Sequence, residues 1–202
     1  MMTALLHSLQ QLDVSLFHLL NRSINNPVFD QVMPFITNEH HFVIPLIIIW
    51  FGLLIFGGKR GRVAAILLLF ATISADLIAA QVIKPLVGRL RPCHALEHVR
   101  LLVRCGGKYG FVSNHAANMF ASMTVLALFY WKYRWYFWSL AALIAFSRVY
   151  VGVHYPGDIL GGTLLGITLG WLWFSLLVVV NNYLRKQEKL WLEWRTPPPE
   201  TI

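Results

Sequence analysis

Three short stretches of the chain combine cationic side chains, histidines, a hydroxyl group and a carboxylate at fixed spacings. The first is Lys-x6-Arg-Pro at residues 84–92, the second is Ser-x-His at 113–115, and the third is Ser-Arg-x5-His-x3-Asp at 147–158. Cationic side chains can bind the oxygens of a phosphate, and a histidine can attack phosphorus or protonate a leaving group. The stretches therefore suit phosphoryl chemistry, and the candidate residues are Lys84, Arg91, Ser113, Asn114, His115, Arg148, His154 and Asp158.

The two cations of the first stretch also have an ordinary structural explanation. Lys84 and Arg91 lie seven residues apart, so on a continuous helix they would share a face and extend toward lipid head groups. Pro85 and Gly88 disturb such a helix, and we expect Pro92 to end it.

The remaining candidates lie at the ends of predicted helices. Arg148 follows a long uncharged stretch. An ionisable residue within such an apolar segment indicates a functional role. Ser113 and Asn114 are good helix caps, and a helix amino terminus offers unpaired N–H groups to an anion. His154 and Asp158 are four residues apart, so the carboxylate can orient the imidazole if a helix begins between them.

The composition indicates an integral membrane protein. Of the 202 residues, 57% are hydrophobic and 13% are charged, whereas about 25% of the residues in a soluble domain are charged. The net charge is +8, but the chain has no long Lys/Arg tract or nucleic-acid motif, so we predict no nucleic-acid partner. The length allows a single domain, residues 1–202.

Five apolar segments approach the length of about 20 residues that a helix needs to cross a bilayer. They are residues 40–57, 63–88, 115–131, 136–153 and 158–181. Residues 4–20 mix polar side chains with leucines, which predicts an amphipathic helix in the membrane interface. If this segment crosses the bilayer instead, the chain has six spans. We therefore predict an all-α bundle of five to six transmembrane helices, with interfacial helices in 1–39, a transmembrane core in 40–183 and a cytoplasmic tail in 184–202.

Clusters of basic residues predict the orientation of this bundle. The clusters are Lys59, Arg60 and Arg62; Lys132 and Arg134; and Arg185, Lys186 and Lys189. Five spans place all three on one side, which the positive-inside rule makes cytoplasmic. The 89–114 loop and the 154–157 turn then face the periplasm of a bacterial inner membrane. The 89–114 loop is itself basic, which a phosphate-binding site would explain. Asp76, in the middle of a span, is interpreted as a packing or relay residue outside the site.

The chain has two cysteines, Cys93 and Cys105, and both lie in the 89–114 loop. On the oxidising side of a membrane they favour a disulfide that closes a loop of about a dozen residues. Two unpaired thiols are one alternative. A zinc site with His94 and His98 is another, although no second close pair of ligands completes it.

Taken together and in this order, the three stretches resemble the signature of the type 2 phosphatidic acid phosphatase family. That signature is Lys-x6-Arg-Pro, Pro-Ser-Gly-His and Ser-Arg-x5-His-x3-Asp, and the first and third parts match completely. The second part departs, because Val112 stands in place of the family's proline and Asn114 in place of its glycine. The Ser113 hydroxyl, the residue-114 amide and His115 are retained, so the departure favours altered specificity over lost activity.

The resemblance implies a compact helical bundle and a role for each candidate residue. His154 would attack phosphorus and form a phosphohistidine, while Asp158 would fix its tautomer. His115 would protonate the leaving lipid oxygen and then help to activate water. The phosphate oxygens would be bound by Lys84, Arg91, Ser113, the Asn114 amide and Arg148.

We therefore expect a lipid phosphate or pyrophosphate phosphatase that needs no cofactor or metal ion and acts on a membrane lipid at the outer face. Undecaprenyl pyrophosphate is the first candidate substrate, with phosphatidylglycerol phosphate, phosphatidic acid and lipid A 1-phosphate as rivals. A lipid phosphotransferase with the same nucleophile is one alternative. A non-catalytic lipid-binding or transport protein is another, and the sequence leaves the oligomeric state open.

Overall fold

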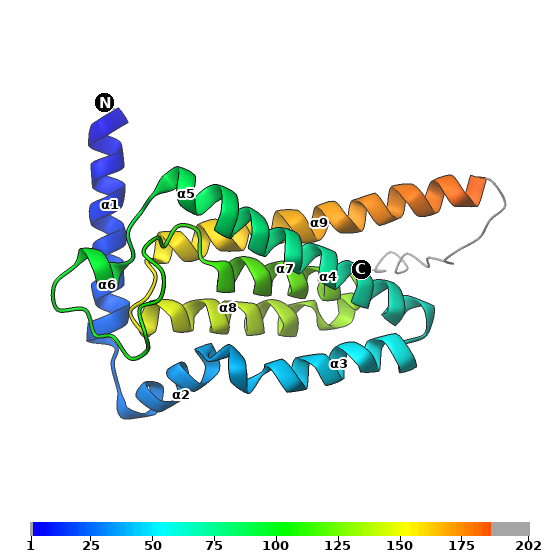
Figure 1. Ribbon diagram of the computed structural model, residues 1–202, viewed down its shortest axis with the longest axis horizontal. Helices are drawn as coiled ribbons and strands as arrows, with labels where there is room; N and C mark the ends of the chain where they lie inside the picture. The colour runs from blue at the N-terminus through cyan, green and yellow to red at the C-terminus, as the bar shows by residue number, and fades with distance from the viewer. Residues whose placement is uncertain (1, 187–202) are drawn as a thin grey trace, which may run out of the picture.

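The computed structural model describes residues 2–186, with the side chains of residues 7–184, as a bundle of helices (Figure 1). The elements are α1 (Met2–His18), η1 (Leu19–Ser23), α2 (Pro27–Thr37), η2 (Glu39–His41), α3 (Val43–Phe56), α4 (Gly58–Leu77), η3 (Ile78–Ile83), α5 (Lys84–Val87), α6 (Pro92–Ala95), α7 (Asn114–Phe129), η4 (Trp131–Tyr133), α8 (Arg134–Tyr150) and α9 (Pro156–Lys186). Within this range, β-type pairing is limited to an isolated bridge between Leu90 and Tyr109. The predicted all-α fold is confirmed.

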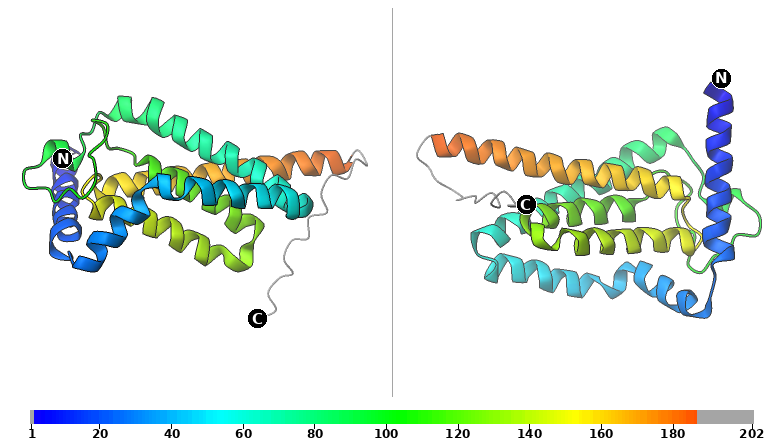
Figure 2. Two further views of the ribbon diagram at one scale, coloured as in Figure 1. Left: turned by 60° about the horizontal axis from the view of Figure 1, so that its bottom comes forward. Right: turned by 180° about the vertical axis from the view of Figure 1, so that it is seen from behind.

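Helix α7 lies at the centre of the bundle, and α4, α8 and α9 pack around it (Figures 1 and 2). Its small side chains, such as the fully buried Ala117, let the neighbouring backbones approach. On α9, Gly162, Gly166 and Gly170 recur every four residues against α7, and a Cβ at Gly166 would lie 2.4 Å from the Ala117 carbonyl oxygen. The glycine stripe thus fixes the amino-terminal half of α9 against α7.

The outer surface of the bundle is apolar. Ile48 and Phe56 of α3 are 65% and 86% exposed, and Leu164 of α9 is 67% exposed. Two helical stretches of the described chain, Gly58–Val87 and Pro156–Leu184, are long and apolar enough to cross a membrane, and Val43–Phe56 is a shorter apolar helix. A continuous apolar surface of this kind suits contact with lipid, while the count of five to six spans stays a prediction.

The segment predicted as one span over 63–88 consists of three consecutive helical pieces, α4, η3 and α5. It ends at Gly88, which adopts the left-handed conformation with φ 63°, as is common directly after a helix. Pro92 begins α6 instead of ending a helix, because a proline at the first helical position needs no N–H partner. Lys84 and Arg91 therefore do not share one helix face, and the loop between them turns back toward the bundle.

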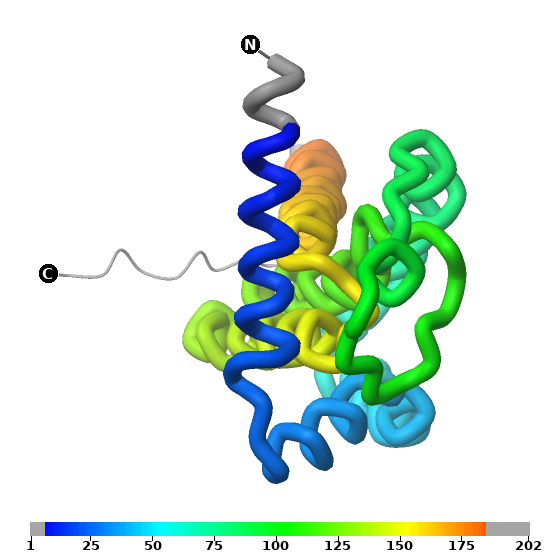
Figure 3. Tube along the Cα trace, turned by 90° about the vertical axis from the view of Figure 1, so that its left-hand side faces the viewer, coloured from blue at the N-terminus to red at the C-terminus, as the bar shows by residue number. Residues whose placement is uncertain are grey.

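Helix α1 runs across the end of the bundle (Figure 3). Phe17, near its carboxyl end, is fully buried, and its ring lies edge-on to that of Tyr155 with 5.5 Å between the ring centroids. The connection between α8 and α9, which contains His154, is therefore packed against α1. An interfacial location for α1 stays a prediction.

The two ends of the bundle differ in character (Figure 1). The α5–α7 loop and the α8–α9 connection lie at the end that α1 crosses, and the α3–α4 and α7–α8 connections lie at the other. The first predicted basic cluster lies near the start of α4, the second lies in η4 and at the start of α8, and α9 also ends on their side. Most of the predicted tail, including Lys189, lies outside the described residues.

Candidate active site

His154 and Asp158 form the buried centre of the site. Helix α9 begins at Pro156, between His154 and Asp158, which meets the condition set by their spacing, and this start brings Asp158 back over the α8–α9 connection. The distance from His154 Nδ1 to Asp158 Oδ2 is 3.2 Å, and the backbone N–H of Tyr155 donates to the same oxygen at 3.0 Å. Both side chains are almost completely buried, so packing and hydrogen bonds fix the imidazole.

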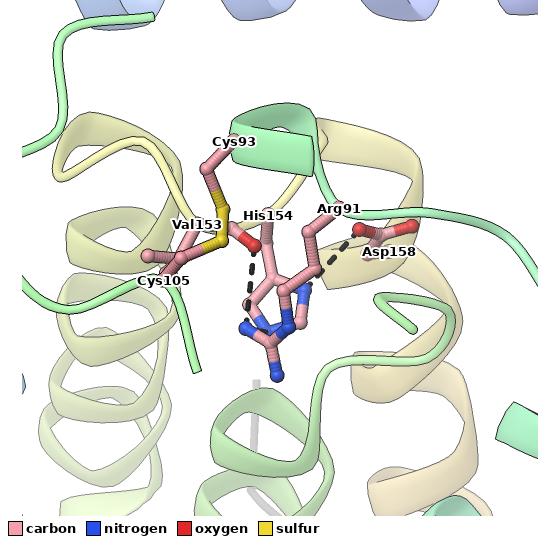
Figure 4. The surroundings of a disulfide bond; sticks show 6 residues. All are labelled: Arg91, Cys93, Cys105, Val153, His154 and Asp158. Carbon is pink, nitrogen blue, oxygen red and sulfur yellow. Dashed lines mark hydrogen bonds and ion pairs between the residues drawn. A yellow bond between two sulfur atoms is a disulfide. The ribbon is translucent and has the colours of Figure 1, made fainter. Parts of the chain in front are cut away.

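Arg91 faces the other nitrogen of this imidazole (Figure 4). Its Nη1 lies 3.0 Å from His154 Nε2 and donates to the Val153 carbonyl oxygen at 3.3 Å. A guanidinium can only donate and an ionised carboxylate can only accept. The contacts therefore assign the proton to Nδ1 and the lone pair to Nε2, which is the tautomer that a nucleophile facing a bound phosphate requires.

The electrostatic surroundings keep the imidazole neutral. Burial, followed by the positive charges of Arg91, Arg148 and Lys84, lowers the pKa of His154 well below its usual range. A neutral imidazole keeps its lone pair at neutral pH. Three cations thus act on one histidine. Lys84 and Arg91 come from the first stretch and Arg148 from the end of α8.

The loop that carries Arg91 is held by a disulfide. The structure joins Cys93 of α6 to Cys105, with 6.1 Å between the Cα atoms, and the bond lies beside Arg91 and His154 (Figure 4). The two sulfurs and a nitrogen of His94 lie within 4.8 Å of one another. Since the sulfurs bond to each other, they are not thiolate ligands here, and the predicted alternatives of free thiols or a zinc site do not match this arrangement.

Ser113 caps the amino terminus of α7, as its residue type predicts. Ser113 is fully buried, and its Oγ accepts a hydrogen bond from the Ala116 backbone N–H at 3.5 Å. Capping therefore orients the hydroxyl along the first turn of α7.

Asn114 connects this helix start to the first stretch. Its Oδ1 accepts a hydrogen bond from Lys84 Nζ, and its Nδ2 donates to Asp76 Oδ1 at 2.7 Å. Asn118 Nδ2 donates to the same Asp76 oxygen at 3.0 Å. Asp76 is thus joined to the candidate site through Asn114, whereas the sequence interpretation placed it outside. Asn114, one of the two residues that depart from the resembled signature, is thus the one that contacts Lys84.

His115 and Arg148 line a cavity of about 650 Å³ beside the buried centre. Its other polar walls come from Asn38, Glu39, His40, His41 and Arg104. Arg148 Nη1 donates to Thr37 Oγ1 at 2.7 Å, so the carboxyl end of α2 holds the cation in place. The sequence interpretation assigned no role in the site to residues 37–41, because nothing in their spacing links them to the three stretches.

Two cationic side chains each have a buried N–H donor that is available to a ligand. The Nε atoms of Arg91 and Arg148 are buried and have no hydrogen-bond partner among the described residues. Buried donors are normally satisfied, and charged donors bind phosphate oxygens well. Both arginines are therefore suited to bind an anion.

The chain is similar in sequence and in fold to several known proteins. A family model described as the PAP2 superfamily matches residues 64–181. The lipid A 4'-phosphatase of Porphyromonas gingivalis is 31% identical over 173 residues, which are 79% of this chain and 70% of that protein. An undecaprenyl-diphosphatase of Sulfolobus acidocaldarius is 32% identical over 139 residues, which are 68% of this chain and 65% of that protein. The crystal structure of Aquifex aeolicus LpxE superimposes with a TM-score of 0.67 at 26% identity, covering 81% of this chain and 95% of that one.

Proposed function

This chain belongs to the PAP2 superfamily, and we propose that it is an integral membrane phosphatase that removes phosphate from the head group of a membrane lipid. The observation that carries the proposal is the buried His154, whose Nδ1 contacts Asp158 and whose Nε2 contacts Arg91. The relatives named above are phosphatases and diphosphatases, which supports hydrolysis of a phosphoric monoester or diphosphate. Transfer of the phosphoryl group from His154 to another alcohol is one alternative, and binding of a lipid without turnover is another.

The proposed reaction has two steps at one phosphorus atom. His154 Nε2 attacks phosphorus, the bond to the lipid oxygen breaks, and His115 donates a proton to that oxygen. Water then attacks the phosphohistidine, the P–N bond breaks, and His115 takes up a proton from the water. Asp158 stabilises the imidazolium that forms while Nε2 carries the phosphoryl group.

Cations bind the phosphoryl oxygens throughout both steps. Arg91 and Arg148 supply their buried Nε–H groups, Lys84 its ammonium group, and Ser113 and the Asn114 amide their donors at the start of α7. This charge replaces the metal ion that other phosphoryl-transfer sites use.

The cavity beside His115 bears on the choice of lipid. The leaving oxygen departs next to the general acid, so the part of the lipid nearest the phosphate would occupy this cavity. A carboxylate, an amide and imidazoles line it, and these groups are hydrogen-bond partners for hydroxyls. Undecaprenyl pyrophosphate remains the first candidate from the sequence. The lining and the similarity to a lipid A 4'-phosphatase favour a phosphorylated glycolipid as the second candidate.

The experiment that tests the proposed function is phosphate release from a panel of lipids in detergent. We expect turnover in excess EDTA and full inhibition by orthovanadate, because vanadate adopts the trigonal-bipyramidal geometry of the transferring phosphoryl group. Release of free phosphate would indicate hydrolysis, whereas formation of a phosphorylated acceptor would indicate transfer. If chelation abolished activity and magnesium restored it, the cationic site would not be sufficient and the mechanism would be wrong.

We further propose that the site faces the periplasm and that the basic turns face the cytoplasm. The test uses single cysteines in a protein whose Cys93 and Cys105 are replaced by serine. Glu97→Cys and Lys59→Cys are suitable because both positions are exposed. Glu97 lies in the α5–α7 loop and Lys59 in the first turn of α4, at opposite ends of the bundle (Figure 1).

An impermeant maleimide added to intact spheroplasts is expected to label Glu97→Cys and to spare Lys59→Cys until the membrane is opened. The reverse pattern would show that the site faces the cytoplasm.

A further inference from the structure

A series of ion pairs between side chains connects α1 to the nucleophile. Arg89 Nη1 donates to Asp158 Oδ1 at 3.0 Å, and Arg89 Nη2 donates to Asp13 Oδ2 at 2.5 Å. Asp158 in turn contacts His154 through its other oxygen. Neither Arg89 nor Asp13 was among the residues selected from the sequence.

The two oxygens of the Asp158 carboxylate have separate partners. Oδ2 accepts from the Tyr155 backbone N–H and lies against His154 Nδ1, whereas Oδ1 is engaged by Arg89. Rotation of the carboxylate would break both sets of contacts. Arg89 therefore fixes the plane in which the carboxylate meets the imidazole.

Arg89 is itself held on several sides. Its guanidinium lies over the Tyr155 ring, with 4.1 Å from Cζ to the ring centroid, and both of its terminal nitrogens are occupied by carboxylates. The Asp13 carboxylate is anchored independently, because its Oδ1 accepts from the Gly157 backbone N–H at 2.7 Å. A Cβ at Gly157 would come 2.7 Å from Asp13 Oδ2, so a side chain at this position would displace the Asp13 carboxylate.

We propose that Arg89 and Asp13 are positioning residues for the nucleophile, acting through Asp158 rather than on the phosphate. This inference rests on the proposed function. With its terminal nitrogens bound to carboxylates, Arg89 differs from Arg91 and Arg148, each of which has a buried Nε–H group without a hydrogen-bond partner in the described part of the chain. These ion pairs also make the carboxyl half of α1 part of the catalytic framework, although this helix lies outside the segment that the family model matches.

The test compares Arg89→Gln, Arg89→Lys and Asp13→Asn with a control ion pair of the same kind. Arg100, in the same loop, pairs with Asp30 of α2 and lies over the Tyr150 ring, but it does not contact Asp158 in the described structure. Arg100→Gln therefore removes an equivalent loop-to-helix ion pair without touching the nucleophile. Asp13→Asn retains an acceptor for Gly157 and removes only the charge that faces Arg89.

We expect Arg89→Gln to lower kcat roughly 10- to 100-fold with KM within about threefold, the range seen when outer partners of functional histidines are removed. Arg89→Lys should recover much of this loss, and Asp13→Asn should cost less than Arg89→Gln. The kcat of Arg100→Gln should stay within about twofold of the unmodified protein, even where its Tm falls. A kcat effect of equal size in the control, or a raised KM at unchanged kcat in Arg89→Gln, would overturn the proposal.

A second measurement is independent of turnover. In protein labelled with ¹⁵N-histidine, the His154 Nδ1 proton should give a downfield resonance that Arg89→Gln shifts or broadens and Arg100→Gln does not. If the unmodified protein released no phosphate from any lipid, the proposed function would be wrong. The spectrum would still show whether Arg89 positions the His154 imidazole. An unchanged His154 resonance in Arg89→Gln would refute that positioning role.

Discussion

Replacing His154 with alanine is expected to reduce phosphate release by about 10³-fold or more, because the covalent route through phosphohistidine is lost. Asp158→Asn should cost less, since the imidazole keeps its place and loses only the charge that stabilises its cationic form. Both rates are measured on purified protein in detergent with a saturating lipid phosphate. Vanadate binding reports separately whether the anion site survives.

The matched control for His154→Ala is His94→Ala, which removes an exposed histidine from the same end of the bundle. Its turnover should match that of the unmodified protein. Phosphate release by His154→Ala at more than a tenth of the normal rate would show that another group attacks phosphorus.

Replacing His115 with asparagine is expected to lower turnover of a lipid phosphate by about 10²- to 10⁴-fold, the usual contribution of a general acid. The loss should depend on the leaving group. With p-nitrophenyl phosphate, whose leaving oxygen needs no proton, the first step should be nearly unaffected. The measurement is the initial burst of p-nitrophenol compared with the burst of lipid alcohol.

The burst comparison separates a general acid from a residue that only binds substrate. A residue that only binds the phosphate would affect both substrates alike, so an equal loss for the two would exclude the proposed role of His115. His41→Asn is a suitable control, since His41 lines the same cavity but lies exposed at its edge.

The sequence predicted those parts of the structure that depend on local chemistry. Ser113 caps α7, as its residue type predicts, and α9 begins at Pro156, where the spacing of His154 and Asp158 allowed a helix start, because capping and proline geometry act within one turn. The disulfide partners were also predictable, since the chain has only two cysteines.

Helix ends that depend on loop conformation were predicted less well. Gly88 ends the helix that was expected to reach Pro92, because a left-handed residue stops a helix more effectively than a proline several positions later.

Contacts between distant segments could not be predicted. Asp13 reaches Arg89 only because α1 crosses the end of the bundle, and Thr37 reaches Arg148 only because α2 packs on α8. Asp76 was visible in the sequence as an unusual carboxylate, but its bond to Asn114 depends on how α4 packs against α7. Such contacts arise from tertiary packing, for which the spacing along the chain holds no signal.

The most direct test of the account is to trap the phosphorylated protein. Unmodified protein is mixed with a ³²P-labelled phosphate ester that has an activated leaving group, quenched in alkali during turnover, and digested for peptide mapping. The account predicts an acid-labile, alkali-stable label on the peptide that contains His154, and no label on that peptide in His154→Ala. A stable label on another residue, or normal turnover by His154→Ala, would contradict it.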